Sequence, residues 1–500
     1  MDVKRPALLA LAVVLGTTFA QTAAAQKLKS VGASRPAAAA PPPAPPTRGG
    51  GGGGGNNGGY RGGGDGGYRG SGSFGGWGGV VGGVLTAIPP GRFVDEGTVD
   101  DDGPPPSSRR SQQNAARRNS NAPPAAERRL VPDEVVIELR NSATPAQIDA
   151  LQRRFRLARI GSTPIALTGT TFYRWRIPDR RSVGAVVRQL EADRLVASAQ
   201  PNYQFALQET AAAAEGDPAQ YELAKLHLPQ AHALAKGGKV RVAVIDSAVD
   251  TTHPDLAGVI AETFNATGTP VVAHAHGTAI AALIAAHGKL VGAAPEASIL
   301  AVRAFDPKGG SAQGTTFAII KGLDWAVAHH ARVINMSFAG PADPAIHRAL
   351  EAAHRKGIVL IAAAGNAGPK SPPLYPAADA DVIAVTGTDA QDRVLAVANR
   401  GRYIAVAAPG ADLLVAIPGG GYEVSSGTSY AAAEIAGIAA LLIDRNGDLK
   451  PTEVRGLLIG TAHDLGPKGR DAEFGAGLVD AFAAVSATDT PVARASTGAR

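Results

Sequence analysis

Apolar residues beyond residue 220 follow two spacings, and this pattern predicts an α/β domain over residues 221–485. Short, nearly continuous apolar runs predict buried strands at 240–245, 332–336, 358–362, 381–385 and 404–407. Apolar residues at helical spacing predict helices at 277–287, 316–330, 344–356, 429–444 and 452–460. Buried strands that alternate with helices predict a doubly wound, mostly parallel sheet with helices on both faces.

A smaller unit precedes this domain, over residues 130–208. Strand patterns at 135–139, 171–177 and 196–204 enclose two helical patterns, which begin near Thr144 and Val183. This βα(β)βαβ order suits a small α+β domain of the ferredoxin-like kind. The alanine-rich stretch that follows, 209–220, predicts a linker between the two units.

The first 25 residues have the pattern of a secretory signal peptide. Lys4 and Arg5 precede an apolar run over 7–20, and small residues then lead to a cleavage site after Ala25. A buried N-terminal helix is the alternative. The run is shorter than the roughly 20 residues that span a bilayer, and no later stretch is long and apolar enough. The sequence therefore predicts export to periplasm, cell surface or medium, with no membrane span after signal removal.

Residues 26–129 form a Gly/Pro/Arg-rich arm that composition predicts to be disordered. Glycine occupies 22 of the 35 positions from 49 to 83, too many for the segment to bury a core. Tyr-Arg-Gly occurs at Tyr60 and Tyr68, which leaves nucleic-acid binding or surface adhesion open. A flexible linker is the favoured interpretation, and no nucleic-acid partner is expected. Residues 486–500 are predicted to form a flexible tail.

Composition excludes several kinds of chemistry. The chain has no cysteine, so disulfides, thiolate metal sites and a cysteine nucleophile are all excluded. The formal net charge of +6 is spread unevenly, with +4 on residues 130–208 and −5 on residues 209–500. Opposite net charges favour association of the two units, although they do not locate an interface.

Four polar residues lie where the predicted strands end or helices begin. Asp246 and Asn366 each follow a strand, whereas His276 and Ser429 each open a helix. Side chains at the carboxyl ends of parallel strands share one edge of the sheet, so these residues can meet. A histidine can take the proton of a serine hydroxyl, and a buried carboxylate can orient that histidine. A helix N-terminus and an asparagine amide can supply donors to an oxyanion.

Each residue taken alone also has a structural explanation. Asp246 and Asn366 could be turn residues, and Ser429 could be a helix N-cap. His274 and His276 could suggest a metal pair, but no third ligand has supporting spacing, so no metal site is predicted. The four local contexts occurring in one chain, in this order, favour the catalytic interpretation.

These motifs resemble those of subtilisin-like serine proteases, peptidase family S8. The resemblance covers about residues 230–485 and rests on Val-Ile-Asp246, His276-Gly-Thr, Val-Ile-Asn-Met-Ser337, Ala-Ala-Ala-Gly-Asn366 and Gly-Thr-Ser429. It implies an endopeptidase with Asp246, His276 and Ser429 as a catalytic triad that forms an acyl-enzyme. It also implies that Asn366 is the oxyanion donor, and it implies substrate-binding residues at Ser337, Phe338, Ala339, Gly340, Ala364 and Gly365.

The unit at 130–208 resembles the inhibitor-like propeptide of the same family. The resemblance implies a self-inhibited precursor whose own propeptide is bound in cis. The position of the linker between the two units predicts that the protease cuts itself near 205–220. Polypeptides are the implied substrates and no cofactor is required. Structural calcium is common in the family, but its ligands cannot be assigned here.

Departures from the family pattern leave two other functions open. Ala248 and Ala339 stand where glycine is usual, and Tyr430-Ala-Ala-Ala433-Glu434 replaces the common Met-Ala-Ala-Pro-His. A catalytically weak or inactive relative that binds peptides is one alternative. A surface adhesion protein that acts through its glycine-rich arm is the other.

Overall fold

The computed structural model describes residues 120–140, 143–208, 210–211, 220–238, 240–308 and 311–489. The predicted signal peptide 1–25, the arm up to residue 119, and residues 490–500 of the predicted tail lie outside the described residues. Most of the predicted linker, 212–219, lies outside them as well. Along the described part of the chain, no helix combines the length and apolar character needed to cross a membrane.

A seven-stranded sheet forms the centre of the larger unit, and every pair of neighbouring strands in it is parallel. Its order is β15 (Ile404–Pro409), β14 (Val382–Thr388), β13 (Val359–Ala363), β11 (Val333–Met336), β6 (Arg241–Asp246), β8 (Ser298–Arg303) and β7 (Ile260–Asn265). The predicted parallel α/β fold is confirmed. Strands β7 and β8, which complete the edge beyond β6, have no counterpart among the predicted strands.

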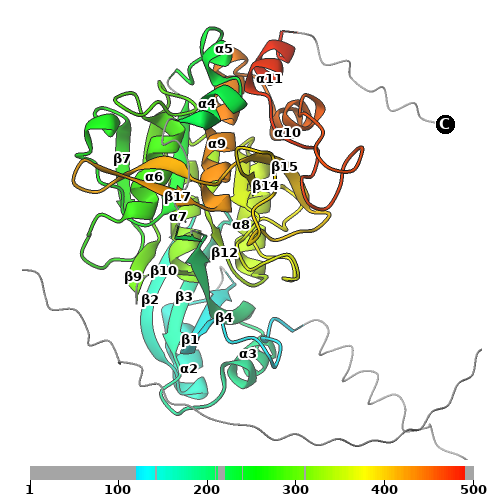
Figure 1. Cartoon of the computed structure of the whole chain (residues 1–500). Coiled ribbons are helices and arrows are strands. Elements are labelled where there is room, and N and C mark those ends of the chain that lie inside the picture. The colour runs from blue at the N-terminus through cyan, green and yellow to red at the C-terminus, as the bar shows by residue number, and fades with distance from the viewer. Residues whose placement is uncertain are drawn as a thin grey trace, which may run out of the picture. The chain divides into compact units, whose positions relative to one another are not determined.

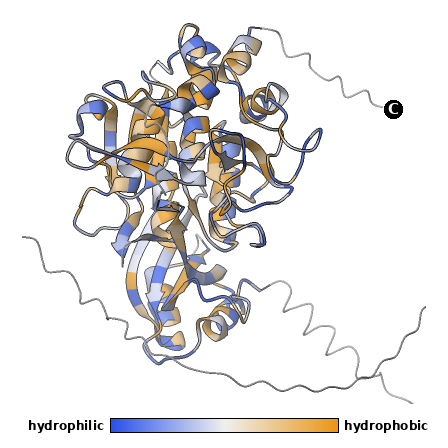
Figure 2. Cartoon of the chain, in the orientation of Figure 1, coloured by the Kyte–Doolittle hydropathy of each residue, from blue (hydrophilic) through white to orange (hydrophobic). Residues whose placement is uncertain are grey.

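Alternate residues of the strands face two helix layers. In β6, Val242 and Val244 pack in a core with α6 (Ala275–Ala285) and α9 (Thr428–Arg445). Ala243 and Ile245 pack in a second core with α7 (Thr316–Ala328) and α8 (Pro344–Arg355). This is the period-two alternation of a strand that is covered on both faces. Figure 1 shows the helices around the sheet, and Figure 2 shows apolar residues concentrated in the central strands and helices.

Shorter elements complete the larger unit. Four helices lie near its ends in sequence: α4 (Tyr221–Lys225), α5 (Leu228–His232), α10 (Pro451–Gly460) and α11 (Ala481–Ala487). Two hairpins project from it, one of β9 (Phe305–Lys308) and β10 (Ser311–Thr315), the other of β16 (Leu413–Ile417) and β17 (Gly421–Ser426). The two-residue strand β12 (Phe338–Ala339) follows β11.

The smaller unit is a four-stranded antiparallel sheet with two helices. Its elements are β1 (Leu130–Leu139), α2 (Pro145–Phe155), β2 (Ala158–Ile165), β3 (Thr170–Arg176), α3 (Val183–Glu191) and β4 (Val196–Leu207), with strand order β2-β3-β1-β4. Each helix begins at a side-chain cap, Thr144 for α2 and Ser182 for α3. Trp175, Val186 and Leu190 are fully buried between sheet and helices. This is the ferredoxin-like arrangement that the pattern predicts.

The two units share an apolar core and a strand. Val136 and Phe172 of the smaller unit pack in the same core as α7 and α8, and β4 continues into the larger unit, where it pairs with β10 and β12. Among the described residues one ion pair joins the units, Arg348 to Glu138 at 2.6 Å. Its cation belongs to the larger, net acidic unit, so close packing and strand pairing, not overall charge, determine where the units meet.

Three predicted boundaries change. Residues 120–129, assigned to the disordered arm, are ordered and bond to the smaller unit, so the boundary at 129 is wrong. Helix α11 ends two residues beyond the predicted domain end at 485. Within the predicted linker, β5 (Thr210–Ala211) pairs with β17. Composition misses these features because the bonding partners come from distant parts of the chain.

Candidate active site

Asp246 and His276 meet at the carboxyl-terminal edge of the parallel sheet. Asp246 is the last residue of β6 and His276 the second residue of α6, and both are fully buried. The imidazole Nδ1 lies 2.8 Å from Asp246 Oδ1. The same oxygen accepts the backbone N–H of Ser247 at 2.7 Å and its hydroxyl at 3.0 Å. Three contacts therefore converge on Oδ1, whereas Oδ2 has no hydrogen-bond partner among the described residues.

Ser247 also joins the end of β6 to the start of α6. Its Oγ accepts the backbone N–H of Gly277 at 3.0 Å. A Cβ at Gly277 would lie 2.5 Å from the Ser247 carbonyl oxygen, so a side chain does not fit there. The next residue, Ala248, is buried, and its carbonyl accepts the N–H of His274 at 2.8 Å. The methyl group that distinguishes Ala248 from glycine is accommodated beside this connection.

Ser429 lies in the first turn of α9, beside the end of strand β4. Its hydroxyl donates to the carbonyl oxygen of Gln208 at 2.5 Å and lies 3.1 Å from the carbonyl oxygen of Ser337. The ring of Tyr430 lies next to the imidazole of His276, with 6.0 Å between centroids. Helices α6 and α9 therefore bring the histidine and the serine to the same region.

Asn366 follows β13 and faces the start of α9. Its Oδ1 accepts from the backbone N–H and the hydroxyl of Thr428, at 3.3 and 2.9 Å. With the amide oxygen held in this way, Nδ2 is a buried donor without a hydrogen-bond partner among the described residues. A buried donor of this kind is costly unless a ligand or reaction intermediate uses it.

Strand β4 lies between β10 and β12, which contains the predicted substrate residues Phe338 and Ala339, and the space between these two strands is here called the groove. Ala206 pairs with Ala339 and Leu207 with Phe338 on one side, and residues 204–206 pair with β10 on the other. The N–H of Gln208 then donates to the carbonyl of Ser337 at 3.3 Å. The chain is thus bound in extended form, and it leads to the Ser429 hydroxyl.

Two of the predicted substrate residues do not bond to this strand. The carbonyl of Ala364 accepts from the Tyr403 hydroxyl, and the N–H of Gly365 donates to Thr428 Oγ1. Neither residue makes a hydrogen bond to 204–208 in the part of the chain that the structure describes. Asn366 does so instead, because its backbone N–H donates to Gln208 Oε1 at 2.8 Å.

An aromatic pocket receives Phe205, three residues before Gln208. The Phe205 ring lies edge-on to Phe338, at 5.9 Å between centroids, and Phe338 contacts Phe305 at 4.9 Å. A Cβ at Gly340 would lie 2.3 Å from the Phe205 ring, so this glycine makes room for it. Phe338 and Gly340 are among the predicted substrate residues, whereas Phe305, the first residue of β9, is not, because no strand was predicted over β9.

The described residues contain no group of three or more His, Asp or Glu placed to hold a metal ion. The ring of His274 caps α6, with Nδ1 accepting the N–H of His276 at 3.3 Å. Asp255 is buried, and its two carboxylate oxygens accept the N–H groups of Lys289 and Leu290 and the hydroxyl of Tyr422. These donors already satisfy that carboxylate.

Two buried acids influence each other across α9 and α4. Glu434, on α9, and Glu222, on α4, are both almost completely buried. Burial raises the pKa of Glu222 to about 7. Burial and the charge of Glu222 raise the pKa of Glu434 well above its ordinary value. The departure at Glu434 therefore places a titratable group in the core of the nucleophile-bearing helix.

Comparisons with known proteins match this geometry. The model of the family described as "Subtilase family" matches residues 237–477. The chain is 35% identical to thermitase of Thermoactinomyces vulgaris, over 53% of this chain and 95% of that protein. It is 32% identical to a thermophilic serine proteinase of Bacillus sp. (strain AK1), over 71% of this chain and 88% of that one.

Two further similarities concern an extracellular protein and a solved structure. The minor extracellular protease Epr of Bacillus subtilis is 33% identical, over 55% of this chain and 43% of Epr. The structure of fervidolysin from Fervidobacterium pennivorans, titled a keratinolytic enzyme related to subtilisin, aligns with a TM-score of 0.64 and 25% identity. That alignment covers 73% of this chain and 62% of fervidolysin.

Proposed function

Because the chain belongs to the subtilase family of serine endopeptidases, we propose that it is an exported protease made as a self-inhibited precursor. In this proposal Ser429 is the nucleophile, His276 the general base and Asp246 the carboxylate that orients it. Export is supported by the signal-peptide pattern of residues 1–25 and by the extracellular description of Epr. No cofactor is needed, because side chains supply every reacting group; any calcium would be structural.

One observation carries the precursor proposal: the Ser429 hydroxyl lies 2.5 Å from the carbonyl oxygen of Gln208. Residues 204–208 are bound between β10 and β12 as a substrate would be, with Gln208 at the position before the cut bond. The cut therefore falls between Gln208 and Glu209, within the segment 205–220 that the sequence indicates.

The proposed reaction follows from these positions. His276 takes the hydroxyl proton as Ser429 Oγ attacks the carbonyl carbon of Gln208, and Asp246 stabilises the resulting imidazolium. The Nδ2 of Asn366 and the N–H groups at the start of α9 donate to the oxyanion. His276 then returns the proton to the departing amine of residue 209, and water hydrolyses the acyl-enzyme. The new carboxylate of Gln208 stays in the groove as a bound product, which blocks other substrates.

The contacts of Phe205 in the groove also suggest which kind of residue the substrates have in common. Phe205 fills the pocket of Phe305, Phe338 and Gly340, so an aromatic residue four positions before the cut bond is expected to favour cleavage. Polypeptides with such a residue are the proposed substrates.

The test follows the purified precursor over time by intact mass and N-terminal sequencing. Wild type should yield a fragment that ends at Gln208 and a protease that begins at Glu209. Ser429→Ala should stay whole, because loss of this nucleophile costs about a millionfold in turnover in the related subtilisin case. Ser486→Ala, on α11, is the matched control and should be processed like wild type.

Two results would count against the proposal. A new N-terminus elsewhere in the wild type would show that residues 204–208 do not lie in the register described. Absence of cutting, together with failure of an organofluorophosphonate to label Ser429, would favour the peptide-binding alternative.

A further inference from the structure

Residues 120–129, here called the strap, are bound to the smaller unit at both ends. At the first end, the Ser120 hydroxyl and the Asn121 N–H donate to the two oxygens of Glu191, at 2.5 and 2.7 Å. The Asn121 side chain also donates to Ser198 of β4 at 3.3 Å. Glu191 is the last residue of α3, where the helix dipole disfavours a negative charge. The two donors from the strap offset that cost, so the contact stabilises both the strap and the end of α3.

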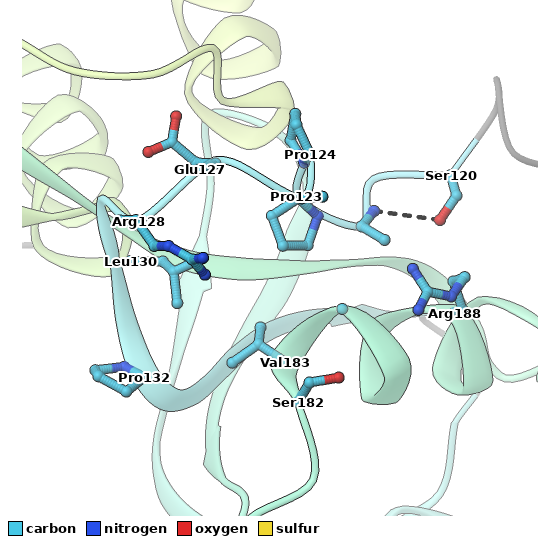
Figure 3. A pocket seen from close by; sticks show the side chains of 13 residues that line it. Ser120, Pro123, Pro124, Glu127, Arg128, Leu130, Pro132, Ser182, Val183 and Arg188 are labelled. Atoms are coloured by element: carbon cyan, nitrogen blue, oxygen red, sulfur yellow. Dashed lines mark hydrogen bonds between the residues drawn. The ribbon is translucent and has the colours of Figure 1, made fainter.

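The middle of the strap packs over the start of α3. Pro123 Cδ lies 3.4 Å from where a Cβ of Gly184 would be, so the proline ring is within van der Waals distance of the first turn of the helix. Figure 3 shows Pro123, Pro124 and Leu130 across from Ser182 and Val183. These residues help to line a cavity of about 920 Å³. Proline restricts the free chain, so ordering this segment costs less conformational entropy than usual.

The second end of the strap reaches strand β4 where it enters the groove. The Arg129 carbonyl accepts the N–H of Gln204 at 2.9 Å, and Leu130 pairs with Tyr203. Gln204 pairs on its other side with Thr315 of β10. Leu130 packs against both the core of the smaller unit and the core shared with α7 and α8.

We infer that the strap is an inhibitory device, which fastens β4 in the active-site groove and slows release of the smaller unit after the chain is cut. The inference rests on the proposed precursor function, because it concerns the step that follows cutting. Without the strap, β4 loses its hydrogen bond from Gln204 to Arg129, four residues before Gln208, and α3 is left with an uncompensated charge at Glu191. Release is then expected to be about tenfold faster or more, because a strand that is held less firmly in its bound conformation binds less tightly.

The experiment compares three precursors: the full chain, a chain without residues 26–119 and a chain without residues 26–129. Mass spectrometry measures cutting at 208–209, and hydrolysis of a peptide substrate measures the lag before activity appears. Deleting 26–119 should leave the lag unchanged. Deleting 26–129 should leave cutting intact but shorten the lag about tenfold or more. An equal lag in the two deletions, with cutting intact, would overturn the inference.

A single substitution tests the same contact in the full chain. Glu191→Gln removes the charge that Ser120 and Asn121 contact and should also shorten the lag. Asp149→Asn, an exposed acid-to-amide change on α2, is the control and should not. If the full chain is not cut at 208–209, the precursor proposal itself fails, and this is visible before any lag is compared.

The strap could instead act by stabilising the fold of the smaller unit. Each variant is therefore also made with Ser429→Ala, which prevents cutting, and its thermal unfolding is followed. A change in the unfolding midpoint that is too small to account for the shorter lag supports fastening of β4. A lower midpoint that accounts for the shorter lag would show a purely structural role and overturn the inference.

Discussion

The buried acids Glu222 and Glu434 should make the stability of the protease unit depend on pH. Each has an Oε2 without a hydrogen-bond partner among the described residues. The Glu222 Oε1 accepts from Gln220 at 3.1 Å, a neutral donor. The nearby Lys225 is engaged elsewhere, with Asp392 and the carbonyl of Ala390. Two buried carboxyls without a compensating cation favour a protonated state.

The remaining titratable groups around the pair do not alter this conclusion. The hydroxyl of Tyr221 donates to the Ala411 carbonyl, and burial and nearby acids raise the pKa of Tyr221, so it stays neutral. On α5, burial lowers the pKa of His232, whose ring contacts the Ala293 carbonyl. At the other end of α9, His276 contacts Asp246. The protons on the two glutamic acids therefore dominate the expected behaviour.

The direction in which stability changes with pH follows from proton binding. The folded state holds these protons more tightly than the unfolded chain, so stability is greatest at low pH and falls as pH rises. For Glu222 the window runs from the ordinary pKa of 4.5 to about 7. At about 1.4 kcal/mol per tenfold change in proton affinity, this is a loss of about 3 kcal/mol. For a unit of this size the loss lowers Tm by roughly 5–10 °C.

The assay is thermal unfolding from pH 5 to pH 9, with Ser429→Ala present in every sample to prevent self-digestion. The parent should lose stability across this range. Glu434→Gln keeps the shape of the side chain without its charge, and this variant should lose clearly less stability between pH 5 and pH 9. Glu423→Gln, an exposed acid on β17, should behave like the parent. The same fall in Tm in Glu434→Gln and the parent would refute the reasoning.

Two further predictions concern the groove. Asn366→Leu should lower kcat on a peptide substrate by about 10²- to 10³-fold with little change in KM, because a donor to the oxyanion is lost; an unchanged kcat would remove Asn366 from that role. Gly340→Ala should shorten the inhibited phase of the precursor, because the new Cβ would lie 2.3 Å from the Phe205 ring. Phe205→Ala in the same chain should restore part of the lag by removing the clash, and a lag insensitive to Gly340→Ala would show that the ring is not held there.

Local pattern was enough to predict most of the fold. Buried strands such as β13 are continuous apolar runs, and helices such as α8 carry apolar residues on one side, so neighbours in sequence reveal them. Asp246, His276 and Ser429 could be proposed as a triad because each stands at the end of a strand or the start of a helix. Strand β7 was missed, because a partly exposed edge strand alternates apolar and polar residues less clearly.

Tertiary structure decided which distant residues contact each other. The partner of Ser429 is Gln208, 221 residues earlier, and that of Glu434 is Glu222, on a helix of five residues with little pattern of its own. The strap has the composition of a disordered arm and is ordered because Glu191 supplies two acceptors for it. Periodicity records which face of an element is buried, but such contacts depend on which surfaces meet after folding. Their energies arise between residues that are far apart in the chain, where local pattern carries no signal.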